Sequence, residues 1–298
     1  LGAAIAMPAA AQFRIEISGV GATQLPIAVA PLRGETGASV PVSAVIRADL
    51  ERSGVFRSVD APTGLDERSP LPQEAVRARG GDALLAGSLT VLADGRVDVR
   101  YKLWDAVRNT EYFARAATVL PADLRLAAHR IADEIYEKLT GDRGVFATRI
   151  AYVTKAARQY TLRITDADGE GGQVALNSPE PIISPAWAPD GRELAYVSFE
   201  SQKAVIYAQD VMTGKRRPIA NFRGSNSAPA WSPDGSTLAA TLSREGGSQL
   251  FLMDRNGGNV RRLTSSPSID TEPVFSADGK LIYFISDRSG GPQIYRVG

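Results

Sequence analysis

Few residues of this chain could carry catalysis or hold a metal. The 298 residues include one histidine, His129, and no cysteine. Without cysteine there are no disulfides, no thiol nucleophile and no thiolate ligands for zinc or iron–sulfur clusters. A site built from several imidazoles is excluded as well. The composition therefore argues against most hydrolase and metalloenzyme designs, and we expect no cofactor and no metal.

The remaining candidate residues have structural explanations. His129 falls in a predicted amphipathic helix over 122–140 but off its apolar stripe, so we expect a solvated side chain. Asp190, Asp234 and Asp278 recur every 44 residues, each followed by glycine. Asp-Gly after proline or alanine is typical of a tight turn. A metal would need oxygen ligands that converge from several loops, so we interpret these aspartates as turn residues.

The segments around the turns repeat. Residues 185–191, 229–235 and 273–279 align without gaps as PAWAPDG, PAWSPDG and PVFSADG. A β-rich period of 44 residues is typical of propeller blades with four strands each. We expect strands near 193–198 and 204–209, with counterparts in the later repeats.

One position of the repeat is always aromatic, and it holds Trp187, Trp231 and Phe275. Large rings at one strict position are expected to fill the wedge between neighbouring blades rather than to cage a ligand. Residues 150–298 contain about three and a half periods, whereas propellers close with roughly 4–8 blades. We therefore expect a partial β-propeller over 150–298 and a chain that lacks its C-terminal part.

The first half predicts a separate α/β domain over 12–141, joined to the repeats by a linker over 142–149. Strands are expected at 27–32, 83–91, 96–104 and 111–120, and helices at 41–53 and 122–140, with a loop at 61–72. Gly141 suits the C-cap of the second helix.

The front of the chain indicates export. Residues 1–11, LGAAIAMPAAA, match the end of a secretory signal peptide, with an apolar run, a proline and small residues before the cleavage point. The alternating segment Phe13, Arg14, Ile15, Glu16, Ile17 suits either an ordinary structural strand or a tail that adds to a partner's sheet.

Charge and motifs give no support for binding to nucleic acid, nucleotides or the membrane interior. The net charge of +1 gives no argument for binding nucleic acid. Direct membrane insertion is not expected, because no apolar stretch approaches the ~18 residues that cross a bilayer. Neither the G-x-G-x-x-G nor the G-x-x-x-x-G-K-[ST] nucleotide-binding motif occurs.

Together with these features, four local sequences point to a known family. They are EKLTG at 137–141, TRIAYV at 148–153, SPAW at 184–187 and SFES at 198–201. The chain resembles the TolB family of the Tol–Pal envelope system. The resemblance implies a six-bladed propeller and a non-enzymatic periplasmic scaffold that serves outer-membrane integrity and constriction during cell division.

The resemblance also implies two partners. The inner-membrane protein TolA would engage the segment Phe13–Ile17, and the lipoprotein Pal would bind over one mouth of the propeller. By position, the Pal-facing rim consists of Ser225, Asn226, Ala228, Thr271 and Glu272. Ser225 departs from the family pattern, which commonly has histidine at that position.

Two alternatives stay open. Similar propellers precede serine hydrolase domains in prolyl oligopeptidases, but that function requires G-x-S-x-G followed by an acid and a histidine. The sequence has no G-x-S-x-G, and its histidine precedes the repeats. The second alternative is a generic exported propeller that binds sugar or peptide through the same rim.

Overall fold

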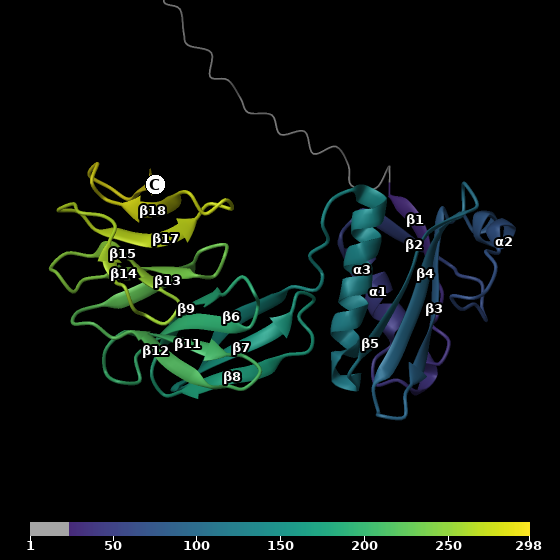
Figure 1. Ribbon diagram of the computed structural model, residues 1–298, viewed down its shortest axis with the longest axis horizontal. Helices are drawn as coiled ribbons and strands as arrows, with labels where there is room; N and C mark the ends of the chain where they lie inside the picture. Colours follow the sequence, from purple (N-terminus) through teal and green to yellow (C-terminus); the bar gives the residue numbers. More distant parts are fainter. Residues whose placement is uncertain (1–23) are drawn as a thin grey trace, which may run out of the picture. The chain divides into compact units, whose positions relative to one another are not determined.

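The chain forms an α/β unit followed by a unit of β-sheets (Figure 1). The computed structural model describes residues 24–298, and it divides into two units after Ala147. The expected fold class, an α/β domain followed by a β-propeller region, is confirmed.

A five-stranded sheet forms the centre of the first unit, with the strand order β2-β1-β3-β4-β5. Its strands are β1 (Leu25–Val29), β2 (Phe56–Val59), β3 (Ala83–Val91), β4 (Val97–Asp105) and β5 (Thr110–Val119). β1 pairs in parallel with β2 and β3, whereas β3, β4 and β5 are antiparallel neighbours. The strands expected at 83–91 and 96–104 are β3 and β4, and the turn between them contains Asp94 and Gly95.

Two helices, α1 (Val42–Arg52) and α3 (Leu124–Thr140), cover one face of this sheet (Figure 1). Their apolar stripes bury Ile46 and Ile135 against sheet residues such as Leu103. Short 3-10 turns, η1 (Glu35–Gly37) and η2 (Pro121–Asp123), precede the two helices. α3 ends at Gly141, whose φ of 85° confirms the expected glycine cap.

The opposite face of the sheet is partly covered by α2 (Gln73–Ala78). Val76 of this helix packs against Leu84 and Trp104, which alternate along their strands with residues of the first face. Sequence patterns did not predict α2 or β2. Both are short, and neither spans enough residues to establish a helical or alternating period.

The second unit consists of four antiparallel sheets, two with four strands and two with three. The first contains β6 (Arg149–Ala156), β7 (Gln159–Asp166) and β8 (Gln173–Ser178). The second contains β9 (Ile182–Trp187), β10 (Glu193–Ser198), β11 (Val205–Asp210) and β12 (Arg216–Ala220). The third contains β13 (Asn226–Trp231), β14 (Thr237–Leu242), β15 (Gln249–Asp254) and β16 (Arg261–Arg262). The fourth contains β17 (Asp270–Phe275), β18 (Ile282–Ser286) and β19 (Gln293–Val297).

The last three sheets follow the 44-residue period of the sequence, since their first strands begin 44 residues apart. β9, β13 and β17 are the equivalent first strands of consecutive sheets, and Figure 1 shows the sheets stacked in chain order within this unit. The turn after each first strand follows the expected chemistry. Gly191, Gly235 and Gly279 have φ of 67°, 70° and 70°, a region that glycine enters without strain.

The aromatic column packs between the sheets, as expected. Trp231 is buried in a cluster that joins the second and third sheets, where it shares a core with Val197 and Phe251. Trp187 and Phe275 take the same place in the neighbouring clusters. The guanidinium of Arg255 lies 5.5 Å from the centre of the Trp231 ring, and this position supports a packing role.

Candidate functional site

The predicted rim residues lie at one end of the second unit, where the first strands β13 and β17 begin. Figure 1 shows these strands in adjacent sheets. We call the loops that precede β13 and β17, together with the first residues of those strands, the rim. The structure therefore brings both halves of the predicted set, at 225–228 and 271–272, to equivalent positions of neighbouring sheets.

The rim backbone has the same unusual conformation in three sheets. Ser184, Ala228 and Glu272, spaced 44 residues apart, have φ of 52°, 49° and 52°, and each precedes a proline. Non-glycine residues rarely adopt this left-handed region, which costs about 1–3 kcal/mol. The ladder register shifts at each position, so every first strand contains a bulge there. The repeat thus keeps one backbone conformation at the rim.

The buried side chain of Asn226 forms hydrogen bonds with the loop before β13. Its side-chain amide donates to the carbonyl oxygens of Ala204 and Phe222, both at 3.0 Å, and to that of Gly224 at 3.3 Å. Its oxygen accepts from the Phe222 N–H at 3.0 Å. Because Asn226 is fully buried, it shapes the rim but presents no side chain to a partner. Ala228 is buried too.

The other three predicted residues reach the surface. Ser225 and Glu272 are exposed, and Thr271 is half-buried. The Ser225 N–H donates to Ser243 Oγ at 2.8 Å, so its loop is tied to the end of β14. The Thr241 hydroxyl donates to Thr271 Oγ1 at 3.3 Å and connects the third sheet to the fourth at the rim.

Sequence reasoning missed Asp270, the equivalent of Asn226 in the fourth sheet. Its carboxylate is fully buried and accepts from Arg288 at 2.9 Å and from Ser266 Oγ at 3.1 Å. Burial acts to raise the pKa of Asp270, but hydrogen bonds from Ser286 and Arg288 outweigh it and hold the pKa below its ordinary value. Its place 44 residues after Asn226 was the available signal.

The aspartates of the repeated turns form hydrogen bonds within those turns. Each accepts a hydrogen bond from the backbone N–H two residues later, at 2.9 Å for Asp190 and 3.1 Å for both Asp234 and Asp278. Asp190 also pairs with Arg255 at 2.8 Å. These contacts agree with their interpretation as turn residues.

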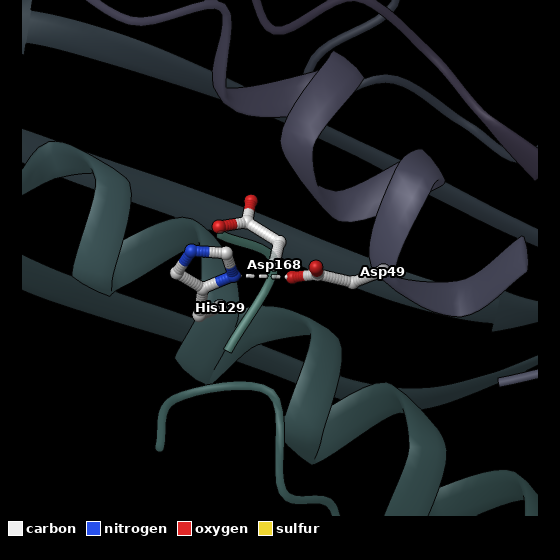
Figure 2. A group of neighbouring side chains, drawn as sticks. All are labelled: Asp49, His129 and Asp168. Atoms are coloured by element: carbon white, nitrogen blue, oxygen red, sulfur yellow. Dashed lines mark hydrogen bonds and ion pairs between the residues drawn. The ribbon is translucent and has the colours of Figure 1, made fainter. Parts of the chain in front are cut away.

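His129 is buried, so the prediction of a solvated side chain was wrong. The side chain is 1% exposed on α3, and its Nδ1 donates to Asp49 Oδ2 of α1 at 2.5 Å (Figure 2). Arg52 approaches the other oxygen of Asp49 at 2.9 Å. Because α1 packs against α3, a flank of α3 outside its apolar stripe is buried as well. The imidazole thus makes a buried polar contact between two helices.

Two hollows lie elsewhere. One of about 400 Å³ lies between the turns of the third and fourth sheets, lined by Asp234, Asp278 and Lys280 among others. Its serines Ser232 and Ser236 donate to Asp234 at 2.5 and 2.8 Å. The carboxylates of Asp234 and Asp278 also accept hydrogen bonds from backbone N–H groups of their own turns, so these polar groups serve the turns themselves. A smaller hollow of about 270 Å³ lies in the first unit beside Tyr112.

The expected signal peptide at 1–11 and the segment Phe13–Ile17 lie outside the described residues. Among the residues that the structure describes, no helix has the length and apolar character needed to cross a membrane.

Comparison with known families gave two matches. A family model described as "TolB amino-terminal domain" matches residues 13–112, and one described as "TolB beta propeller domain" matches residues 136–298.

Curated relatives of the chain carry the same family name as the two matching models. The "Tol-Pal system protein TolB" of Polaromonas naphthalenivorans is 61% identical over 228 residues, which cover 76% of this chain and 53% of that protein. The Bordetella pertussis protein of the same name is 54% identical over 222 residues, 74% of this chain and 51% of that protein. The chain spans about half the length of the curated relatives it matches.

A solved structure is similar as well. The crystal structure of TolB from Acinetobacter baumannii matches with a TM-score of 0.76 at 37% identity, over 92% of this chain and 68% of that one.

Proposed function

Because the chain belongs to the TolB family, we propose that it is a non-enzymatic scaffold of the Tol–Pal system in the periplasm. It binds the lipoprotein Pal at the rim and TolA through the segment Phe13–Ile17. Through these contacts it serves outer-membrane integrity and constriction during cell division. The curated relatives carry the Tol–Pal name, which supports a role in that system.

The recurring, hydrogen-bonded backbone of the rim is the observation that carries this proposal. A docking surface gains affinity when its groups are fixed before the partner arrives. At the rim, the bulges at Ala228 and Glu272 and the buried amide of Asn226 fix the backbone. Ser225, three residues before the bulge of the third sheet, and Glu272, at the bulge of the fourth, are exposed at the same end of two neighbouring sheets. Loops held by a rigid scaffold are suited to recognition.

A non-catalytic role agrees with the chemistry of the side chains. The single histidine lies buried against Asp49, where it cannot serve as a base for a substrate in solution. The hydroxyls of Ser232 and Ser236 donate hydrogen bonds to the Asp234 carboxylate of their own turn.

The Pal proposal is tested by measuring the affinity of the full-length protein for the soluble domain of Pal. Replacing Thr271 and Glu272 by alanine is expected to raise the dissociation constant about tenfold or more, because it removes the side chains with which the fourth sheet would contact Pal at the rim. Lys280→Ala, an exposed change at the opposite end of the fourth sheet, is the matched control. Absence of Pal binding by the unmodified protein would refute the proposal.

The TolA proposal has its own test. Deleting residues 13–17 is expected to abolish capture of TolA and to leave the thermal unfolding of the protein unchanged. Capture of TolA by the deleted protein at the original level would contradict it.

A further inference from the structure

Arg244, which follows the end of β14, lies at the rim beside a residue of the proposed Pal contact. Its neighbour Ser243 bonds to Ser225 through both main chain and side chain, with Ser243 N donating to Ser225 O at 3.1 Å and Ser225 N donating to Ser243 Oγ at 2.8 Å. The side chain of Arg244 is about one-third exposed. It therefore stands at the surface of the rim on a backbone that is held in place.

The guanidinium of Arg244 is oriented by stacking. Its central carbon lies 4.6 Å from the centre of the Phe222 ring, and Phe222 belongs to the loop that Asn226 holds. An arginine stacked on an aromatic ring loses little further side-chain freedom when it binds a ligand. The group is thus ordered before any partner arrives.

The N–H groups of Arg244 are not committed to acceptors of the described chain. Glu245 lies nearby, but the closest approach of its carboxylate to Arg244 is 3.6 Å, longer than a hydrogen bond. The same carboxylate lies 3.5 Å from Arg262. One acid therefore faces two arginines, and this small cluster has a surplus of positive charge.

The 44-residue period supplies an internal comparison. Arg288 is the equivalent of Arg244 in the fourth sheet, and it also stacks on an aromatic ring, that of Phe284 at 5.2 Å. Arg288, however, donates to the buried carboxylate of Asp270 at 2.9 Å and to Ser286 at 2.8 Å. The third sheet has Asn226 at the position of Asp270. The Asn226 amide hydrogen-bonds backbone groups, so it is not a buried carboxylate that could accept from Arg244.

From this difference we infer that Arg244 is an anchor for a carboxylate of the partner. The partner surface over the third sheet is accordingly an acidic segment with an aspartate or glutamate that pairs with this guanidinium. Planar, bidentate pairing with a carboxylate is the contact for which arginine is better suited than lysine. The inference rests on the proposed binding of Pal at the rim and names the chemistry of that contact.

The test uses the full-length protein and the soluble domain of Pal, with affinity measured by calorimetry at several salt concentrations. Arg244→Gln is expected to raise the dissociation constant about tenfold, and Arg244→Glu to raise it further, because the partner is acidic. Arg244→Lys should fall between the original protein and Arg244→Gln. The affinity of Arg244→Gln should also depend less steeply on salt.

Lys280→Gln removes one exposed positive charge at the opposite end of the fourth sheet and is expected to leave affinity unchanged. Equal unfolding temperatures would show that each variant is folded. Normal affinity of a folded Arg244→Gln protein, or tighter binding by Arg244→Glu, would overturn the inference while the binding of Pal at the rim still stands. If the unmodified protein fails to bind Pal, the proposed function itself falls.

Discussion

At the scale of the residue, the single histidine of this chain makes a structural contact. His129 and Asp49 are each 1% exposed and join two helices that cover one face of the first sheet. A buried charge that loses its partner is costly, about 3–5 kcal/mol in typical proteins. This pair should therefore matter for stability rather than for reaction with a substrate.

We expect His129→Leu to lower the free energy of unfolding by about 2 kcal/mol, because Oδ2 of the buried Asp49 carboxylate loses its hydrogen bond while Arg52 still pairs with Oδ1. Urea denaturation measures the change. Arg130→Ala, at the next, exposed position of α3, is the control and should change stability by less than about 0.5 kcal/mol. A His129→Leu protein as stable as the control would show that the contact is unimportant.

At the scale of the element, an ion-pair network joins neighbouring sheets of the second unit. Glu193 of β10 accepts hydrogen bonds from Arg217 of β12 and, at 2.9 Å, from Arg255 of the β15–β16 turn. Arg255 also pairs with Asp190. The network thus connects the second sheet to the third on the side away from the rim.

The network makes stability depend on pH. The hydrogen bond from Arg217, with further help from Arg255, lowers the pKa of Glu193 below the ordinary value of 4.5. A carboxyl whose pKa is lower in the folded state contributes stability above its unfolded pKa and loses it as pH falls through the folded value. Stability should therefore decline as pH falls below about 4.5.

We expect Glu193→Gln to reduce this decline between about pH 5 and pH 3, since glutamine does not titrate. Glu272→Gln removes an exposed carboxylate that has no ion pair in the described chain, and it should leave the curve nearly unchanged. Denaturation at a series of pH values compares the variants. Identical pH curves for Glu193→Gln and the unmodified protein would refute the role of this network.

The elements also show what sequence could and could not predict. The 44-residue spacing of the Asp-Gly turns predicted the sheets of the second unit, because each turn closes one pair of strands and its aromatic residue packs against the next sheet. His129 was misjudged because its partner, Asp49, lies 80 residues away and packing alone brings them together. In the same way, no local pattern indicates that Asn226 turns inward to bond four backbone groups.

At the scale of the whole molecule, we propose that one end of the propeller sheets docks a partner and that the other end serves the structure. The rim has fixed loops, exposed polar side chains at Ser225 and Glu272, and the ordered guanidinium of Arg244. The opposite end has the Asp-Gly turns, whose carboxylates are occupied by hydrogen bonds within their own turns. A partner that recognises the rim should therefore contact residues of two neighbouring sheets at once.

Site-specific photo-crosslinking tests this assignment most directly. A photoreactive phenylalanine analogue is placed at position 225, 272 or 280 of the full-length protein, which is then irradiated with the soluble domain of Pal. The account predicts covalent adducts with Pal from positions 225 and 272 and none from position 280. Adducts from position 280 alone, or none from either rim position while Pal is bound, would contradict it.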